Sequence, residues 1–305
     1  MKKYLFFLKP YLKETVWAGN RLKKHLKTSR KIGEAWLISA YKNAESVIDN
    51  LPLSKFYQKN PDFFKNYPKK IYPNLLKIID AGQKLSLQVH PDDKMAQNFN
   101  SLGKDEAWFV IAESKNPFII GAKSDNFISE IGKINKENLL NFTNLHNLAR
   151  GDLAYISAGI IHSIPEGALV FEIQQNSDLT FRIYDFDRYD LNGKKRELHL
   201  DLAIKATKAK LKPLIVKKNT EKQQVLIKNK FFNLKRVSIN SVFSLLPDSN
   251  VFWFEIIIIS GEGRVEGFCF KTFDAILISG QIKKVIRFFA KNAIILVNEI
   301  RENNF

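Results

Sequence analysis

Short apolar runs separated by glycine-containing turns dominate the middle of this chain of 305 residues. The runs have the length of strands, and they do not alternate regularly with helical patterns. They cover residues 75–79, 106–111, 118–120, 153–157, 169–174 and 179–184. Such a series predicts an antiparallel barrel or sandwich, not a parallel sheet.

Three stretches interrupt the strand-rich pattern with helical character. In residues 53–67 the aromatic spacing is compatible with helical turns that break at Pro61. Residues 125–148 are expected to form a helical insertion, and residues 199–208 a helix. These stretches add a few helices to a mainly β protein.

The turn at Lys212 and Pro213 is the expected domain boundary. Residues 1–211 are then one domain with helical insertions, and residues 212–305 are a smaller second β domain. Its expected strands cover residues 231–237, 252–259, 269–273, 275–278 and 293–297. Because the second domain contains no histidine, we expect it to lack a metal site and to serve in packing.

Residues 85–93 read LSLQVHPDD and alternate between apolar and polar side chains. In an extended strand Ser86, Gln88 and His90 share one face, and the apolar side chains point the other way. Taken alone, this pattern is typical of a strand whose polar face is solvated. Other residues at the ends of expected strands suggest a different interpretation.

Two such residues are potential metal ligands: Glu106 opens the run 106–111, and His162 ends the sequence GIIH. With Gln88 and His90 they supply one amide oxygen, two imidazoles and one carboxylate, which zinc accepts readily. Iron, manganese, cobalt or nickel can occupy a similar shell. Because the chain has one cysteine, a disulfide within it and a cysteine-based metal site are excluded.

The charge is strongly positive, with 48 Lys and Arg against 31 Asp and Glu and a formal net charge of +17. This balance favours phosphorylated small molecules, nucleic acid or anionic surfaces as partners. The lysines are spread along the chain, however, as a codon bias would produce, and no nucleic-acid-binding module accompanies them. The most apolar run, residues 256–259, is far shorter than the ~18 residues that span a bilayer. We expect a cytoplasmic protein without nucleic-acid or membrane partners, and the sequence leaves its oligomeric state open.

Four blocks of the sequence resemble the type I mannose-6-phosphate isomerases, the zinc-dependent phosphomannose isomerases of the cupin superfamily. In the family's order they are LSLQVHPDD (85–93), GKDEAW (103–108), GDLAYISAGIIH (151–162) and EIQQNSDLTFR (172–182). The resemblance implies a cupin-type antiparallel β-barrel (jelly roll) with a few helices and a smaller cupin-like β domain. The short chain is similar to the compact bacterial form.

The resemblance also implies a metal site and a reaction. One zinc ion per chain would be bound by Gln88, His90, Glu106 and His162. The family interconverts mannose 6-phosphate and fructose 6-phosphate by moving a proton between C1 and C2. The partner implied is therefore a small sugar phosphate, and no organic cofactor is needed.

Four further residues match positions in the family's active site. Arg182 matches its arginine, which would stabilise the charge of an enediolate. Glu172 would transfer the proton or position the substrate, unless it only pairs with Arg182 or Lys104. Ser86 and Lys104 would bind the substrate phosphate, although an ordinary turn lysine also fits Lys104. The identity of the base is left open.

Two other functions fit parts of this pattern. A cupin metal enzyme of another type, such as an iron-dependent oxygenase, usually has a histidine-dominated shell, and the amide ligand and the arginine argue against it. A non-catalytic sugar-phosphate-binding protein would have lost Arg182 or a ligand. Here all of these residues are present.

Overall fold

The computed structural model describes residues 4–302, which divide into two compact units. The first unit takes the chain up to Tyr11, residues 36–75 and the chain from Asn219 onward. The second unit takes residues 12–35 and 76–218. Each unit is thus assembled from separate segments, whereas the sequence suggests one boundary between residues 211 and 212. A separate domain beginning at residue 212 stays a prediction.

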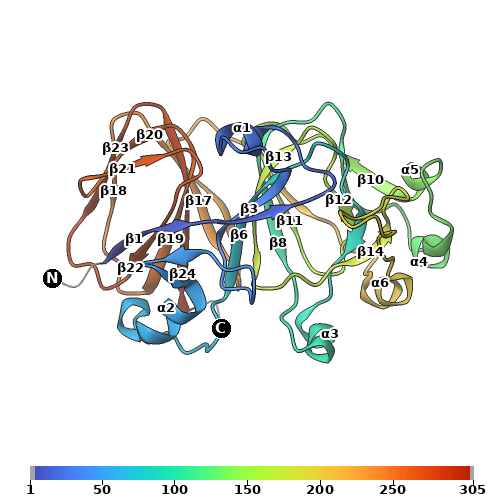
Figure 1. The fold of residues 1–305 in the computed structure, drawn as a ribbon, viewed down its shortest axis with the longest axis horizontal. Helices are drawn as coiled ribbons and strands as arrows, with labels where there is room; N and C mark the ends of the chain where they lie inside the picture. Colours follow the sequence, from blue (N-terminus) through green and yellow to red (C-terminus); the bar gives the residue numbers. More distant parts are fainter. Residues whose placement is uncertain (1–3, 303–305) are drawn as a thin grey trace. The chain divides into compact units, whose positions relative to one another are not determined.

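The first unit contains two β-sheets. The larger has eight strands in the order β16 (Gln223–Lys228), β17 (Asn233–Ile239), β24 (Ala293–Arg301), β19 (Val251–Ser260), β22 (Ala275–Ser279), β1 (Leu5–Lys9), β4 (Val47–Ile48) and β5 (Leu51–Pro52). The smaller has the order β18 (Val242–Leu245), β23 (Ile286–Ala290), β20 (Glu262–Val265) and β21 (Phe268–Lys271). Figure 1 shows β1, from the start of the chain, alongside β22 from near its end.

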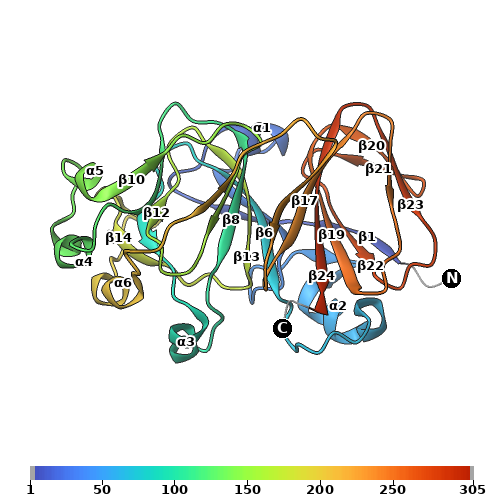
Figure 2. The ribbon, with the colours of Figure 1, turned by 180° about the vertical axis from the view of Figure 1, so that it is seen from behind.

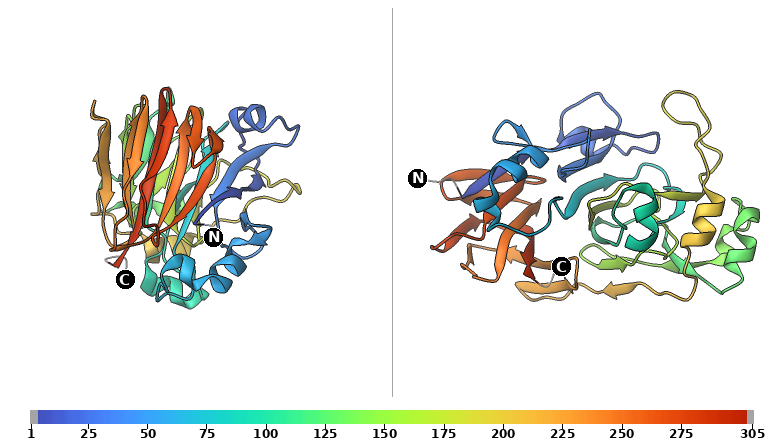
Figure 3. Two further views of the ribbon diagram at one scale, coloured as in Figure 1. Left: turned by 90° about the vertical axis from the view of Figure 1, so that its left-hand side faces the viewer. Right: turned by 90° about the horizontal axis from the view of Figure 1, so that it is seen from below.

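Side chains that alternate between the two faces of a strand explain how these two sheets pack. In β23 the side chains of Ile286, Phe288 and Ala290 are buried, while Arg287 and Phe289 are exposed. The buried side chains join those of β19, β22 and β24 in one apolar core. The central strand β19 is covered on its other face as well, where Phe64 packs edge-on against Trp253 with ring centroids 5.0 Å apart. The strands of this unit lie next to one another in the left panel of Figure 3.

Phe64 belongs to the first of the helical stretches expected from the sequence. Residues 53–67 form α2 (Leu53–Lys59) and the 3-10 helix η1 (Pro61–Phe64), so the predicted break at Pro61 is confirmed. Proline is tolerated at the first position of η1 because the backbone N–H groups there have no partner within the helix.

The second unit also combines two sheets. The seven-stranded sheet has the order β15 (Leu214–Val216), β11 (Leu153–Ile156), β8 (Glu106–Ala112), β13 (Leu169–Gln175), β6 (Asn74–Asp80), β3 (Ile32–Ile38) and β2 (Tyr11–Glu14). The last three strands begin or end in the first unit. The five-stranded sheet has the order β10 (Thr143–His146), β9 (Phe118–Ala122), β12 (His162–Ser163), β7 (Leu87–Val89) and β14 (Phe181–Tyr184).

Short helices of this unit lie between its strands in the sequence. They are α1 (Arg21–His25), α3 (Asp93–Ala96), η2 (Gln97–Phe99), α4 (Phe127–Glu130), η3 (Ile131–Lys133), α5 (Leu139–Phe142) and α6 (Leu200–Ala206). Figure 2 shows α4, α5 and α6 at the end of the unit that carries β10 and β14. The helix predicted over residues 199–208 is thus confirmed as α6, whereas the predicted insertion 125–148 is only partly helical and ends in β10.

The strand pairs have the antiparallel register expected from the sequence, as in β13·β8 and β19·β24. The fold is mainly β with antiparallel sheets, so the predicted fold class is confirmed. Among the described residues, the structure contains no helix long and apolar enough to cross a membrane.

Candidate active site

Three of the predicted metal ligands meet in the second unit. The ligand atoms of His90, Glu106 and His162 lie within 4.8 Å of one another, and all three residues are buried. Nε2 of His90 is 3.2 Å from Oε2 of Glu106, and Nε2 of His162 is 3.3 Å from its Oε1. Since Glu106 opens β8 and His162 opens β12, the cluster joins the facing sides of the two sheets.

The outer ring nitrogens of both histidines are held by the backbone. Nδ1 of His90 is 2.7 Å from the carbonyl oxygen of Leu179, and Nδ1 of His162 is 2.9 Å from that of Ile160. A carbonyl accepts a hydrogen bond, so each Nδ1 carries the proton and each Nε2 turns a lone pair toward the cluster. Burial lowers the pKa of His90 to about 3 and also lowers the pKa of His162, so both rings are neutral, as metal ligands must be.

The carboxylate of Glu106 is charged although it is buried. Burial would raise its pKa, but the charge of Lys104 holds the pKa well below its ordinary value. Neither carboxylate oxygen has a hydrogen-bond partner among the described residues, nor has Nε2 of His90. Buried polar atoms without partners are costly, and a divalent cation bound by two imidazoles and a carboxylate would satisfy all of them. The donor set therefore fits a metal ion.

Gln88 lies beside this cluster on β7, between β12 and β14 of the five-stranded sheet. In the register of the sheet it is directly opposite His162 of β12 on one side and Arg182 of β14 on the other. Its Nε2 is 3.3 Å from Nε2 of His162, and its Oε1 accepts a hydrogen bond of 3.0 Å from Ser86 Oγ. A half-turn of the amide would present the oxygen to a metal and leave the nitrogen to donate to Ser86.

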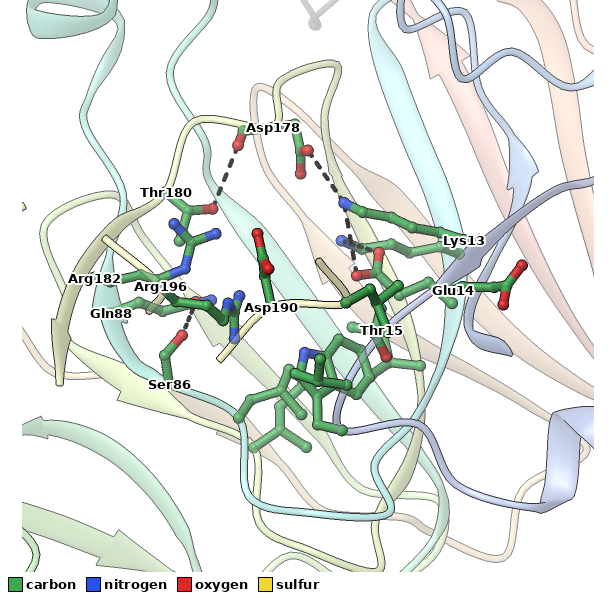
Figure 4. Close-up of a pocket in the computed structure, with 18 of the residues that line it drawn as sticks. Lys13, Glu14, Thr15, Ser86, Gln88, Asp178, Thr180, Arg182, Asp190 and Arg196 are labelled. Atoms are coloured by element: carbon green, nitrogen blue, oxygen red, sulfur yellow. Dashed lines mark hydrogen bonds and ion pairs between the residues drawn. The ribbon is translucent and has the colours of Figure 1, made fainter. Parts of the chain in front are cut away.

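A cavity of about 300 Å³ opens next to Gln88 (Figure 4). Its lining is rich in charged and polar side chains, with apolar side chains such as Trp17 and Ile79 between them. The charged residues that line it are Lys13, Glu14, Glu34, Lys77, Lys104, Glu172, Asp178, Arg182, Asp190 and Arg196. A cavity of this kind suits a small, strongly polar and charged ligand.

The family-model comparison matches residues 5–116 to the catalytic domain of type I phosphomannose isomerase. The mannose-6-phosphate isomerase of Streptococcus mutans is 32% identical over 298 residues, 91% of this chain and 93% of that protein. The chain belongs to the type I mannose-6-phosphate isomerase family. The isomerase ManA of Bacillus subtilis is also 32% identical, over 85% of this chain and 86% of its own length. A crystal structure of a Bacillus subtilis mannose 6-phosphate isomerase has 27% identity and a TM-score of 0.88, covering 98% of this chain and all of that one.

A row of four charges, three of them buried, forms the wall of this isomerase-family site on the seven-stranded sheet. Neighbouring strands contribute Glu172 (β13), Lys77 (β6), Glu34 (β3) and Lys13 (β2), so the charges alternate along the row. Nζ of Lys77 is 3.0 Å from Glu172 and 3.3 Å from Glu34. Lys13 is 3.9 Å from Glu34 and 3.3 Å from Asp178. Each buried carboxylate thus has a nearby cation, which offsets the cost of its burial.

The structure shows the surroundings of the other predicted active-site residues. Glu172 pairs with Lys77 and accepts a hydrogen bond of 2.8 Å from Trp108 Nε1, instead of pairing with Arg182 or Lys104. Burial, followed by the nearby charge of Glu106, raises the pKa of Glu172. Lys104 is not a solvated turn lysine, because it is buried with Nζ 3.4 Å from Glu106. The assignment of roles to these residues stays a prediction.

Sequence reasoning missed Lys77, Glu34 and Lys13 as part of this site. A signal was present for two of them, because Lys77 interrupts the apolar run 75–79 and Glu34 opens a run of apolar residues that includes Trp36. A charged residue inside a strand that is expected to be buried needs a partner. The sequence does not say which strands are neighbours, so the partners were not predictable.

Replacing Lys77 by methionine is expected to cost about 3–5 kcal/mol of the free energy of unfolding, because two buried carboxylates lose their shared cation. Lys77 lowers the pKa of Glu172, so its removal raises a folded-state pKa that burial already raises. A raised carboxyl pKa means that stability falls as the pH rises above the unfolded-state value, and the loss should be larger at pH 8 than at pH 5. Urea denaturation at both pH values measures this.

Lys13→Met is the matched control for Lys77→Met. The Lys13 side chain is 35% exposed, so its ion pairs are screened by water and its replacement should cost only about 0–1 kcal/mol. Equal losses for the two variants would contradict the importance assigned to the buried cation.

Proposed function

We propose that this chain is a metal-dependent aldose–ketose isomerase that interconverts mannose 6-phosphate and fructose 6-phosphate. The observation that carries the proposal is the row of His162, Gln88 and Arg182 across three neighbouring strands. This row places a candidate metal ligand, an amide and a cation beside one cavity. Membership in the mannose-6-phosphate isomerase family supports the same reaction.

We propose zinc as the metal, bound by His90, Glu106, His162 and Gln88, one ion per chain. Two neutral imidazoles, a carboxylate and an amide are the nitrogen and oxygen donors that zinc accepts. When bound, such an ion polarises the oxygens of the sugar and lowers the cost of the negative charge that forms on them.

The reaction itself is a pair of proton transfers. Removal of the proton from C2 of the open-chain aldose leaves an electron pair that forms the C1–C2 double bond, and negative charge develops on O1. Transfer of the O2 proton to O1 and delivery of a proton to C1 then give the ketose. The chain must therefore supply a proton carrier and a cation for the developing charge.

Arg182 has the properties of that cation. It lines the cavity, its side chain is half-buried, and its buried Nε has no hydrogen-bond partner among the described residues. An arginine stays charged and its donors have a fixed geometry, so it stabilises an enediolate without carrying the proton. Glu172 is the candidate proton carrier or positioning group: it lines the cavity, and burial raises its pKa, as is common for groups that exchange protons in active sites.

Ser86 and Lys104 are proposed to contact the substrate phosphate. Both line the cavity, and both are buried with their polar groups facing residues of the metal cluster or its neighbour Gln88. A hydroxyl donor and an ammonium group are suitable partners for a phosphate. The charged substrate and the single cysteine support a cytoplasmic location.

A coupled assay with mannose 6-phosphate tests the proposal. The purified protein should form fructose 6-phosphate, lose nearly all activity in a chelator and regain it when zinc is added back. Elemental analysis should find about one zinc ion per chain in the active sample. The control is the same protein carried through the procedure without chelator.

Three results would count against this proposal. A folded, metal-replete sample without turnover would mean that the chain only binds its ligand. Full activity after complete metal removal would contradict a metal-dependent mechanism, and recovery with iron but not zinc would contradict the choice of metal.

A further inference from the structure

A second arginine, Arg196, lines the same cavity as Arg182. It lies in the segment that connects β14 to α6, which projects as a long yellow loop in the right panel of Figure 3. In Figure 4 the labelled Arg182 and Arg196 lie on the side of the cavity that also holds Ser86 and Gln88. None of the blocks that carry the family resemblance includes this residue.

Arg196 is anchored by one end of its guanidinium group only. Its Nη1 is 3.0 and 3.2 Å from the two carboxylate oxygens of Asp185, which is only 3% exposed. Its Nε and Nη2 donate no hydrogen bond to any described residue. The anchor thus fixes the direction of the side chain and leaves two donor nitrogens for a ligand.

The anchor is itself tied to the segment that precedes Ser86. Arg188 binds Asp185 through Nη2 and donates a hydrogen bond of 2.7 Å from Nη1 to the carbonyl oxygen of Lys84. The cation of Arg188 also lies 5.3 Å from the centre of the Phe186 ring. This network holds the base of the loop in place, so Arg196 has a defined position relative to Ser86.

The positive charges of Arg182 and Arg196 would be stabilised by a bound anion. Burial, followed by the charge of Arg196, lowers the pKa of Arg182, which indicates that the guanidinium groups repel each other. The side chain of Arg182 makes no hydrogen bond to the described residues, and its buried Nε is without a partner. A phosphate dianion accepts several charge-assisted hydrogen bonds and would relieve the repulsion.

The spacing of Ser86 and Gln88 along the chain agrees with the dimensions of a sugar phosphate. Gln88 stands next to the metal cluster, where C1 and C2 must react, and Ser86 is two residues earlier, just before β7, with its Cα about 6.6 Å from that of Gln88 and its Oγ 3.0 Å from Gln88 Oε1. The phosphate is attached at C6, the other end of the carbon chain. Substrate bound with C1 and C2 near the metal therefore extends its phosphate along the cavity that Ser86 and Arg196 line.

We propose that Arg196, oriented by Asp185, binds the phosphate group of the substrate together with Ser86. The inference rests on the proposed isomerase function and extends it, because it assigns the 186–197 loop to phosphate recognition. Arg196 discriminates phosphorylated from unphosphorylated hexoses, and Asp185 is a positioning residue that acts through it.

Arg196→Gln tests this, with Lys195→Gln as the matched control. Lys195 is on the same loop, carries the same charge and pairs with exposed Asp187, but it does not line the cavity. For Arg196→Gln we expect the KM for mannose 6-phosphate to rise about 10- to 100-fold, the range of a lost charge-assisted contact, with kcat within about threefold of the wild type. Arg196→Lys should lie between the two, and Lys195→Gln should match the wild type.

Titration with inorganic phosphate by calorimetry gives a readout that does not depend on turnover. The dissociation constant of phosphate for the metal-loaded protein should rise about 10-fold or more in Arg196→Gln and stay unchanged in Lys195→Gln. If wild type binds phosphate with the predicted loss in the variant but has no turnover, the isomerase proposal fails and the phosphate site stands. An unchanged phosphate affinity, or a fall in kcat with an unchanged KM, overturns the role of Arg196.

Discussion

Replacing His90 by alanine is expected to abolish metal binding and to reduce turnover by at least about 1,000-fold. His90 supplies one of the two imidazoles of the cluster, and its Nδ1 is fixed by the carbonyl oxygen of Leu179, so no neighbouring side chain can take its place. The variant also removes the ring nitrogen that lies 3.2 Å from Oε2 of Glu106. Elemental analysis and the coupled assay measure the two effects.

His25→Ala is the matched control, because His25 is an exposed histidine at the end of α1. It should keep its metal and its activity. A His90→Ala protein that retains about one metal ion per chain would show that His90 is not a ligand. Metal content is read directly from the folded, purified sample.

Arg182→Ala is expected to keep its metal and to lose about 100- to 1,000-fold in kcat, the usual cost of removing a donor that stabilises a developing oxyanion. The side chain is next to Gln88 in the register of the sheet but is not among the candidate metal ligands. The expected result therefore differs from that of a metal-ligand variant in one respect: turnover is lost while the metal content stays full. Metal analysis and steady-state kinetics on one preparation distinguish them.

Arg182→Lys separates charge from geometry. A lysine retains the positive charge but lacks the planar set of donors, so this variant should recover only part of the lost kcat. Near-full activity of Arg182→Ala would show that the enediolate charge is stabilised elsewhere. Loss of metal in the same variant would assign Arg182 to the support of the metal site.

The stretch at residues 85–93 shows how much of the site could be predicted from the sequence. Its alternation predicted a polar face; in the structure Ser86 and Gln88 line the cavity and His90 joins the histidine–glutamate cluster, although only Leu87–Val89 has strand geometry. The two ends of the stretch are fixed by other contacts, such as the hydrogen bond from Gly159 N to the carbonyl oxygen of His90. Such contacts join distant segments, and a local pattern does not contain them.

The row of alternating charges, in contrast, was not predictable from the sequence. Lys77, Glu34 and Lys13 are far apart in the sequence and meet only because β6, β3 and β2 are neighbours in one sheet. Strand order depends on the packing of the whole chain, which periodicity does not reveal. The same is true of the strands β16, β18, β20 and β23, which are short or have alternating burial and were not among the predicted strands.

The sequence by itself determined the mainly β class and the family, because short apolar runs and four ordered blocks are local features of the chain. Only the tertiary structure decided that His90, Glu106 and His162 share one centre, that Glu172 pairs with Lys77, and that Arg196 reaches the cavity. The physical reason is that each of these contacts joins residues on different strands or loops. Their distances are set by sheet order and register, and these follow from the burial of the whole chain.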